Sequence, residues 1–384
     1  MAQNEDKIYD LVVLGCGSVG SAVGYYASRE GASVLEIDSY QPPHEFGTHH
    51  GQTRIIRHAY GEGDKYVPLL LEAQSLWEEL QDQTEEKFLH QVGIVNIAPQ
   101  ESDFYKNVLS SAERYSLQVD ILTAEELNER FPTWNFDDDY NAIYEKNAGY
   151  LRTDIIIKEY LEKAKECGAT QVFNQQVFQI INEPDYIRII TDNAEYKARK
   201  LVVSAGSWVK SLYPDLPIQP VRKTFHWFEV EDESLLEKKG FPCFTVNLKS
   251  NETYYGFPGS DNLIKIGRHD GGQYISNYQE QYEYDDNKDA KEVDNLLGTY
   301  LIGTGKLDFG KTCSYDMSPD EDFIIDWLDD RTQIVTGLSG HGFKFVSVLG
   351  HILANRALGK EETNLDLSPF ALDRFTKITE KVKD

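Results

Sequence analysis

The sequence predicts a mixed α/β (α+β) fold, in which a doubly wound, Rossmann-like domain carries a second domain built on a mixed or antiparallel sheet. Three observations predict it. Near the start, a short apolar run ends in a glycine-rich turn and is followed by a helical pattern. Strand–glycine junctions return later in the chain. Between residues 226 and 267, short apolar runs alternate with polar turns, as in antiparallel sheets.

The glycine-rich turn follows a buried strand, Leu11–Leu14, and precedes a helix over Ser21–Arg29. Its sequence is G-x-G-x-x-G. The first glycine allows a tight turn, the second lets a pyrophosphate approach the backbone, and the third lets helix and strand pack closely. The helix N-terminus offers free N–H groups to an anion. The turn therefore predicts a dinucleotide site with contacts from Gly15, Gly17, Ser18, Val19 and Gly20.

A second strand, Ser33–Ile37, ends at Asp38, which lies 18 residues after Gly20. A carboxylate at this distance is placed to accept a hydrogen bond from the ribose of a dinucleotide. The motif alone does not distinguish FAD from NAD, and a glycine-rich turn in an ordinary α/β protein is the alternative.

Composition limits the size, the partners and the location of the protein. A chain of 384 residues is expected to form one large domain or two closely packed domains, with a large hydrophobic core. Its net charge of −26 repels phosphates, so we expect neither a nucleic-acid nor a membrane partner. The four cysteines lie far apart, which predicts no metal site and fits a reducing compartment. The polar start of the chain shows no signal-peptide pattern, so we expect a cytoplasmic protein.

The stretch from Gly47 to Gly63 is unusual for so acidic a chain. Residues 49–58 contain three histidines and two arginines. Such a basic cluster predicts recognition of a phosphate, a flavin or a carboxylate, and a solvated loop with salt bridges is the alternative. The pattern of residues 53–57 predicts the start of a helix or a tight turn, which would place Arg54 and Arg57 close together.

Three further helices are predicted before residue 170. Pro68–Leu80 shows apolar residues at helical spacing. Thr123 and Glu126 form a capping box that opens a short helix. Asp154–Glu166 is the third helix, with Thr153 as its N-cap.

The strands that follow are read from short apolar runs between turns. We predict them at Phe88–Ala98, Gln171–Ile181, Tyr186–Thr191, Lys200–Ser204, His226–Val230, Phe244–Leu248, Tyr254–Pro258, Leu263–Gly267, Phe323–Asp326 and Gln333–Thr336. Residues 205–206 offer a second close backbone approach to a cofactor. Residues 274–304 are polar and helical in parts, and residues 337–345 lead into an apolar helix, Val346–Ala357.

The chain thus leaves the nucleotide-binding domain and returns to it. We assign residues 1–85, 150–220 and 320–384 to that domain, and residues 86–149 and 221–319 to a substrate domain. The antiparallel sheet of the second domain would form the floor or roof of a substrate pocket.

Six segments occur in the order found in one family of enzymes. They are Gly15–Gly20, Gly47–Gly63, Tyr254–Pro258, Lys265–His269, Cys313–Tyr315 and Gly340–Phe345. From residue 9 to about residue 375, the chain resembles the monomeric sarcosine oxidase family of flavin amine oxidases. It is more similar to the N-methyl-L-tryptophan oxidase branch of that family, in segments 220–223, 271–273, 318–323 and 337–340. Gly271 also leaves room for a substrate side chain larger than that of sarcosine.

The resemblance implies the reaction and its partners. A hydride equivalent leaves the N-methyl group of an N-methyl amino acid, and hydrolysis of the imine gives formaldehyde and the primary amino acid. Oxygen reoxidises the FAD and yields hydrogen peroxide. The substrates are then a small N-methyl amino acid and O2, and the family expectation is a monomer. Because the amine must be neutral to react, we expect a rate that rises with pH.

The resemblance also assigns residues. Cys313 matches the cysteine that holds FAD covalently through an S-8α-cysteinyl bond. Arg57 and Lys344 match the pair that binds the substrate carboxylate. Lys265 matches the lysine that activates oxygen, where a cation stabilises developing superoxide. Without the resemblance, these residues would be interpreted as a buried apolar cysteine and as ordinary charges of the surface or of a strand.

Further positions match residues around the flavin and the substrate. The catalytic matches are Arg54, His269, Tyr255 and Tyr315. The flavin-contacting matches, besides the glycine-rich turn, Asp38 and Cys313, are His50, Thr53, Arg54, Val177, Gly340, His341, Gly342 and Lys344. Lone histidines and tyrosines are more often packing residues, which is the alternative for each.

Three other functions remain open at this point. The first is oxidation of sarcosine or another secondary amine, such as pipecolate or a glycated amino acid. The second is an NAD(P)-dependent dehydrogenase, which would give Cys313 and Lys265 no special role. The third is a flavin-binding protein without catalytic activity, which would stay oxidised with every amine.

Overall fold

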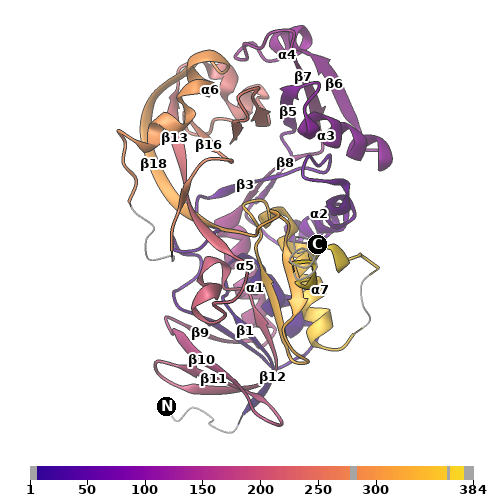
Figure 1. Cartoon of the computed structure of the whole chain (residues 1–384), viewed down its shortest axis with the longest axis vertical. Helices are drawn as coiled ribbons and strands as arrows, with labels where there is room; N and C mark the ends of the chain where they lie inside the picture. The colour runs from indigo at the N-terminus through magenta and orange to yellow at the C-terminus, as the bar shows by residue number, and fades with distance from the viewer. Residues whose placement is uncertain (1–6, 277–282, 361–363, 376–384) are drawn as a thin grey trace, which may run out of the picture.

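The computed structural model describes residues 7–276, 283–360 and 364–375. The molecule is elongated, with two parts stacked along its long axis (Figure 1). The α-helices are α1 Ser18–Arg29, α2 Val67–Asp82, α3 Asp103–Arg114, α4 Ala124–Arg130, α5 Thr153–Glu166, α6 Asp294–Thr299 and α7 Val346–Ala357. Short 3₁₀ helices occupy Asp64–Tyr66, Gly206–Ser211, Glu233–Leu235, Glu237–Lys239, Asp289–Val293, Phe343–Phe345 and Ser368–Phe370.

The lower part in Figure 1 is built on an eight-stranded sheet with the order β10-β11-β12-β1-β2-β9. Strands β20 and β19 extend it beside β12. The strands are β1 Ile8–Leu14, β2 Val34–Asp38, β9 Thr170–Phe173, β10 Val177–Asn182, β11 Ile187–Thr191, β12 Glu195–Val203, β19 Ile324–Trp327 and β20 Thr332–Thr336. Because β1 pairs in parallel with β2 and β12, the predicted doubly wound sheet is confirmed.

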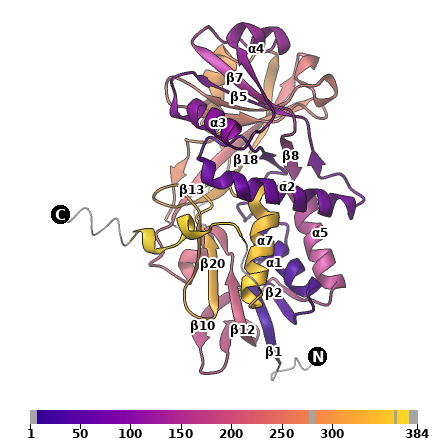
Figure 2. The same ribbon diagram turned by 90° about the vertical axis from the view of Figure 1, so that its right-hand side faces the viewer.

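Helices α1, α5 and α7 pack beside this sheet, and α1 contacts the other two. Helix α1 buries every residue from Val19 to Ser28, because its apolar side chains and glycines face neighbours all round. Figure 2 shows α2 lying across the junction between these helices and the upper part. Trp77 of α2 packs against Tyr160 of α5, with ring centroids 6.1 Å apart. The core is therefore continuous from the sheet to the junction.

The upper part holds a nine-stranded sheet with the order β17-β13-β16-β15-β14-β5-β7-β6, and β18 pairs with β13. Its strands are β5 Ile94–Pro99, β6 Val119–Thr123, β7 Tyr140–Glu145, β13 Gln219–Val230, β14 Cys243–Asn247, β15 Thr253–Gly256, β16 Leu263–Arg268, β17 Gln273–Tyr274 and β18 Thr304–Met317. The pairing is antiparallel except between β14 and β5. The predicted mixed or antiparallel sheet is confirmed.

One face of this sheet positions the chemistry. Side chains alternate along a strand, so Lys223 and Trp227 of β13 point to the same face. Cys313 of β18 lies directly opposite Lys223, and Lys265 of β16 lies directly opposite Trp227. Residues opposite one another share a face, so these side chains gather on one surface of the sheet.

A third, three-stranded sheet has the order β3-β8-β4 and consists of β3 Thr53–Ile56, β8 Gly149–Arg152 and β4 Leu89–His90. The expectation of a helix or tight turn at 53–57 is therefore wrong. Thr53, Ile55 and Ile56 are β-branched and pair with β8, and this tertiary pairing decides the local structure.

Other boundaries differ in smaller ways. The capping box of Thr123 and Glu126 is confirmed. Helix α5 begins at Thr153 itself, and Arg152 occupies the cap position without a side-chain hydrogen bond, so the predicted N-cap is wrong by one residue. The long strand β18 was not expected, because its N-terminal half is polar and exposed. Residues 277–282 of the predicted polar segment lie outside the described residues.

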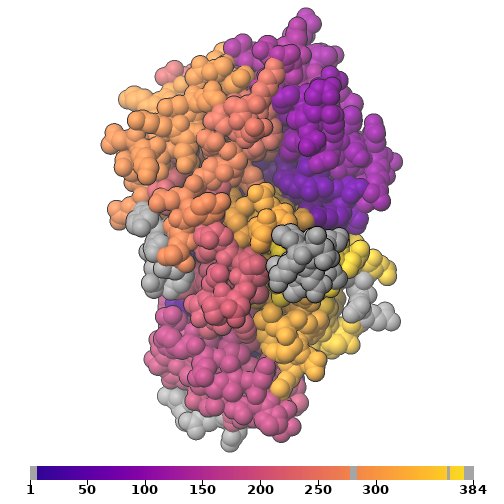
Figure 3. Space-filling view, viewed as in Figure 1, coloured from indigo at the N-terminus to yellow at the C-terminus, as the bar shows by residue number. Residues whose placement is uncertain are grey.

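Figure 3 shows purple and orange segments forming the upper half of one face, and magenta and yellow segments forming the lower half. The division into a nucleotide-binding and a substrate domain remains a prediction. Among the residues that the structure describes, no helix is both long and apolar enough to cross a membrane.

Candidate active site

The glycine-rich turn joins β1 to α1 in the geometry that an anion site requires. Gly15 adopts a left-handed φ of +85°, and a Cβ at this position would lie 2.7 Å from the Ser204 carbonyl oxygen. A Cβ at Gly20 would overlap the Gly15 carbonyl. Helix α1 begins at Ser18, without a capping side chain. Its first N–H groups are thus left for a ligand.

A cavity of about 90 Å³ opens beside this turn. Predicted residues that line it are Gly15, Gly17, Ser18, Asp38 and Val177. Val19 and Gly20 do not line it, because Val19 is in the apolar core and Gly20 packs against the turn. Residues 205–206, the second predicted backbone approach, also line the cavity.

Asp38 is buried at the C-terminal end of β2. One carboxylate oxygen accepts the N–H of Cys16 at 2.7 Å, and the other accepts the N–H of Tyr40 at 2.9 Å. The oxygen bound by Tyr40 also lies 3.3 Å from Nε2 of His44, and the oxygen bound by Cys16 keeps a further lone pair for a hydroxyl donor. Asp38 is therefore fixed in position to accept a hydrogen bond from a ribose in the adjoining cavity.

His49 is a cavity residue that the sequence analysis did not single out. Its ring lies against Gly17, where a Cβ would come within 2.9 Å of Nδ1. Burial lowers the pKa of His49 to about 3, so the ring is neutral. It lay within the recognised basic stretch, but nothing in the pattern separated it from His50.

A second cavity, of about 220 Å³, lies between the two parts of the molecule. Predicted residues that line it are Arg54, Arg57, Tyr255, His269, Tyr315, Gly340, His341 and Lys344. They come from β3, β15 and β18, from the residues that directly follow β3 and β16, and from the segment before α7, which are far apart in sequence. The fold thus brings together eight of the predicted residues.

Arg57 stands at one wall of this cavity and is already paired. Its guanidinium binds the Glu62 carboxylate through two hydrogen bonds, of 2.5 and 2.7 Å. It also donates to Asn96 at 3.2 Å and to Thr245 at 3.3 Å. Burial raises the pKa of Glu62, but Arg57 and nearby cations outweigh it and lower the value to about 2. Nη2 of Arg57 therefore already holds a carboxylate, Nη1 donates to neutral side chains, and Nε has no hydrogen-bond partner among the described residues.

Glu62 lies within the basic stretch, but the sequence pattern did not single it out. The only sequence signal was its place between two glycines, Gly61 and Gly63, close to Arg57.

Lys344 contributes the second cation of the cavity. Its ammonium donates to the carbonyl of His341 at 2.8 Å and to the hydroxyl of Tyr60 at 3.2 Å. Burial, followed by repulsion from Arg57, lowers the pKa of Lys344 to about 7. The protonation of Lys344 therefore changes near neutral pH.

His269, Tyr255 and Tyr315 are neutral side chains of the cavity. Burial and the Lys223 ammonium lower the pKa of His269 to about 4. Burial raises the pKa of Tyr255 to about 12 and that of Tyr315 well above its usual value. The ring of Tyr315 lies flat on Gly340, whose φ is +78°, because a Cβ there would overlap the ring.

Lys265, Thr53 and His50 lie just outside this cavity. The Lys265 ammonium donates to the Gly51 carbonyl and contacts the carbonyl and hydroxyl oxygens of Thr53 at 3.3 and 3.2 Å. Arg54 donates to the carbonyls of Thr48, His50 and Thr53 at 2.6–2.8 Å. These cations hold the loop that runs from the first cavity, at Thr48, to the second, at Arg54.

Cys313 is buried on the same side of the sheet. Burial raises the pKa of its thiol, while Arg54, Lys265 and Lys223 oppose that rise. The neighbouring Ser314 hydroxyl lies 3.0 Å from that of Ser207, whose backbone lines the first cavity. Cys313 is thus near both cavities, in an electropositive setting.

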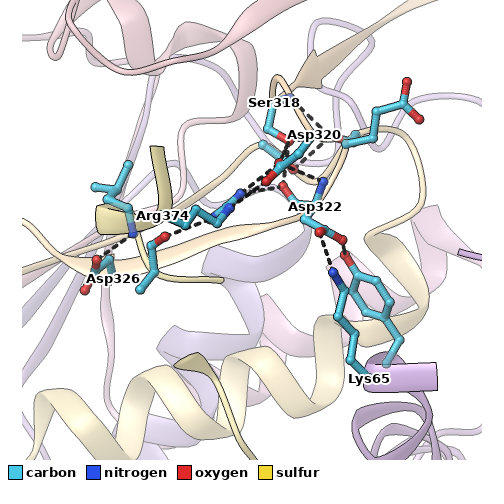
Figure 4. A network of polar contacts seen from close by, with 12 residues as sticks. Lys65, Ser318, Asp320, Asp322, Asp326 and Arg374 are labelled. Carbon is cyan, nitrogen blue, oxygen red and sulfur yellow. Dashed lines mark hydrogen bonds and ion pairs between the residues drawn. The ribbon is translucent and has the colours of Figure 1, made fainter. Parts of the chain in front are cut away.

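The turn 318–322 closes another side of the second cavity through Glu321. Figure 4 shows its anchors. Lys65 and the Tyr66 hydroxyl bind Asp322, the latter at 2.7 Å, and Arg374 binds Asp320 at 2.8 Å. Segments near α2 and the end of the described chain therefore fix this wall.

Two predicted glycines lie elsewhere. Gly342 packs against Leu338. Gly271 lines a neighbouring cavity, and a Cβ there would meet Arg268 rather than the substrate-sized cavity. The interpretation of Gly271 as extra room for the substrate side chain is therefore wrong.

The residues fit FAD better than a metal. The glycine turn and Asp38 suit a pyrophosphate and a ribose, and the loop 48–54 leads from them to the cavity beside Cys313. Within the described ranges, no group of three or more histidine, cysteine or acidic side chains is arranged to hold a metal ion.

Comparison with known proteins gives three results. The family model described as FAD dependent oxidoreductase (DAO) matches residues 10–356. N-methyl-L-tryptophan oxidase of Citrobacter koseri is 47% identical over 372 residues, covering 96% of this chain and 100% of that protein. The Escherichia coli K12 protein of the same name is 47% identical over 371 residues, covering 96% and 99%.

Solved structures with similar folds are more distant in sequence. NikD, an unusual amino acid oxidase essential for nikkomycin biosynthesis, has a TM-score of 0.83 at 20% identity and covers 95% of this chain and 97% of its own. Glycine oxidase from Geobacillus kaustophilus has a TM-score of 0.79 at 18% identity, covering 95% and 98%. At these identities the likeness concerns the fold alone.

Proposed function

Because the chain belongs to the DAO family of FAD-dependent oxidoreductases, we propose that it demethylates an N-methyl amino acid oxidatively, with N-methyl-L-tryptophan as the preferred substrate. The products are the primary amino acid, formaldehyde and hydrogen peroxide. The observation that carries the proposal is the buried cavity in which Arg57 and Lys344 face His269, Tyr255 and Tyr315. When bound, FAD accepts two electrons from the amine and passes them to oxygen.

The substrate carboxylate binds to Arg57 and Lys344. The guanidinium fork presents parallel N–H groups that match a carboxylate, and the Lys344 ammonium adds a point charge. Glu62 takes both of its hydrogen bonds from Nη2 of Arg57 in the structure, so an incoming carboxylate replaces Glu62. This exchange of one carboxylate for another keeps the buried guanidinium paired throughout.

The amine reacts in its neutral form. The cations Arg57 and Lys344 lower the pKa of a nearby ammonium, and the neutral His269 and Tyr255 do not stabilise its charge. His269 and the two tyrosines can accept or donate hydrogen bonds and so orient the N-methyl group. The side chains of the cavity thus favour deprotonation and positioning, and no protein nucleophile is required.

Lys265 and Cys313 act from the sheet face. A buried ammonium at Lys265 stabilises negative charge that develops on oxygen during the second half of the reaction. Cys313 holds the FAD covalently, as the S-8α-cysteinyl derivative. Support comes from the burial of Cys313 between the two cavities and from the three cations that favour its thiolate. His50, Thr53 and Arg54 hold the flavin side of the loop.

The remaining expectations are also proposals. We infer a monomer located in the cytoplasm, with FAD bound by segments 1–85, 150–220 and 320–384, and substrate bound by segments 86–149 and 221–319. The separation of the strands into two large sheets supports the second inference.

Two measurements test this function. Peroxide formation is compared for N-methyl-L-tryptophan, sarcosine and pipecolate at equal concentration, and we expect N-methyl-L-tryptophan to have the highest kcat/KM. Preference for sarcosine would contradict the substrate assignment.

The covalent bond is tested on a denaturing gel. Flavin fluorescence should stay in the protein band of the wild type and of Cys243→Ala, a control that alters another buried, free cysteine. It should be absent for Cys313→Ala. A non-fluorescent wild-type band would overturn the covalent assignment.

A further inference from the structure

The ammonium of Lys265 lies inside a cage of aromatic rings. Its Nζ is 4.9 Å from the ring centroid of Phe225, 4.9 Å from that of Phe257 and 5.5 Å from that of Trp227. The side chain is 5% exposed. Ring faces carry negative potential and attract a cation at these distances.

The strands build this cage directly. Phe225 and Trp227 are two residues apart on β13 and therefore point to the same face. Trp227 lies directly opposite Lys265. Phe257 follows β15, and its N–H donates to the Lys265 carbonyl at 3.0 Å. Phe309 of β18 stacks on Trp227, with centroids 4.4 Å apart, and does not enter the cage. The three rings are thus fixed by backbone pairing around the ammonium.

Lys265 has no carboxylate partner among the ion pairs of the described residues. Its polar contacts are the oxygens of Gly51 and Thr53. The titratable groups that interact with it are Arg54, His50 and Cys313, of which the first is a cation. Burial and Arg54 lower the pKa of Lys265 well below its usual value. Cys313 opposes this loss of charge, together with the oxygen dipoles and the ring faces.

We propose that Phe225, Trp227 and Phe257 are positioning residues. They keep the Lys265 ammonium charged and fixed on the sheet face that also carries Cys313. They thereby sustain the rate of the oxygen step. The inference rests on the role proposed above for Lys265. An aliphatic side chain of similar size would exclude water equally well but would lack the negative ring face. The charge of the ring face, rather than apolar packing, is therefore the property to test.

Four variants separate these effects. Trp227→Leu and Phe257→Leu each remove a ring face, and Trp227→Phe keeps one. Phe309→Leu is the control, because it removes a ring outside the cage. The flavin-loaded enzymes are reduced chemically, without any amine, and mixed with oxygen. The pH dependence of the visible flavin spectrum is recorded in parallel, and Lys265→Met identifies the Lys265 titration by its absence.

We expect Trp227→Leu and Phe257→Leu to reoxidise about five- to tenfold more slowly and to titrate at lower pH. Trp227→Phe and Phe309→Leu should stay within about twofold of the wild type. Unchanged reoxidation in both leucine variants would overturn the proposal, and so would equal losses in Trp227→Leu and Trp227→Phe. If Trp227→Leu does not fold, the reoxidation rate of Phe257→Leu alone decides whether the proposal holds.

A failure of the proposed function would give a different result from a failure of the ring proposal. In that case no N-methyl amino acid reduces the flavin anaerobically, yet the dependence of reoxidation on Trp227 persists.

Discussion

At the scale of single residues, the second cavity and the sheet face beside it are defined by charges held away from water. Arg57, Lys344 and Lys265 are each at most 6% exposed in a chain whose net charge is −26. Each buried cation is kept by specific partners, namely a carboxylate, a hydroxyl with a carbonyl, or carbonyls with ring faces. A buried charge costs several kcal/mol without such partners. These three residues are therefore the sites where substitutions affect function most directly.

Glu62 competes with the substrate for Arg57, so Glu62→Gln should bind carboxylate ligands more tightly. The glutamine leaves the guanidinium with one neutral acceptor in place of an ionic pair, and a ligand carboxylate restores the charge. We expect the Kd of a non-reactive N-acyl amino acid to fall by about ten- to hundredfold, from a charged hydrogen bond of roughly 1.5–3 kcal/mol. Flavin absorbance measures the Kd. Weaker binding would show that Glu62 assists the site.

Lys344 should produce the alkaline limb of the pH profile. Its pKa of about 7 means that the ammonium is lost as pH rises through neutrality, and with it one partner of the substrate carboxylate. Deprotonation of the amine raises the rate over the same range, so kcat/KM should pass through a maximum. Lys344→Arg stays charged and should extend the rising limb to higher pH. An identical alkaline limb in Lys344→Arg would exclude Lys344 as its cause.

Glu36 should make the free energy of unfolding depend on pH. It is fully buried on β2, and burial raises its pKa to about 8, against about 4.5 for the free side chain. The folded state therefore binds the proton more tightly. The contribution of Glu36 to stability is fully present below pH 4.5 and is lost as pH rises through 8.

Glu36→Gln cannot ionise, and its hydrogen bond with Gln171 can be kept. The gain over wild type should grow from near zero in acid to on the order of 5 kcal/mol above pH 8. Thermal unfolding at several pH values measures it. A difference that does not change with pH would contradict the assignment.

At the scale of elements, the glycine-rich turn and the helices α1, α2, α4, α5 and α7 were predictable because their signals are local, whereas α3 was not predicted. The sequence G-x-G-x-x-G marks backbone conformations that only glycine adopts readily. The apolar residues of α2 recur with the period of an α-helix. The strand β3 was not predictable in this way. Its structure depends on pairing with β8, almost 100 residues later, which propensity does not reveal.

A substitution at Gly20 tests the geometry of the glycine-rich turn. A Cβ there would overlap the Gly15 carbonyl, so Gly20→Ala must displace either the turn or α1. We expect a loss of bound flavin and a destabilisation of about 1–3 kcal/mol. The control is Gly298→Ala in α6, where an added Cβ has open space. Flavin content and the unfolding midpoint are measured together. Full flavin content in Gly20→Ala would contradict this geometry.

At the scale of the whole molecule, the long strands β13 and β18 extend from the upper part toward the lower part, which is built on the eight-stranded sheet. The resemblance to flavin amine oxidases predicted which distant residues meet, and the structure brings eight of them to one cavity. Glu62 and the rings around Lys265 escaped prediction. Their roles follow from contacts between segments such as β13 and β16, and those contacts exist only in the folded chain.

The central claim is that this protein oxidises the N-methyl group of an N-methyl amino acid with FAD. The most direct test mixes the purified protein with N-methyl-L-tryptophan without oxygen and follows the flavin absorbance, then admits air. We expect rapid bleaching of the flavin, followed by formaldehyde and hydrogen peroxide in equal amounts. A protein that contains no flavin, or a flavin that stays oxidised with N-methyl-L-tryptophan, sarcosine and pipecolate alike, would contradict the claim.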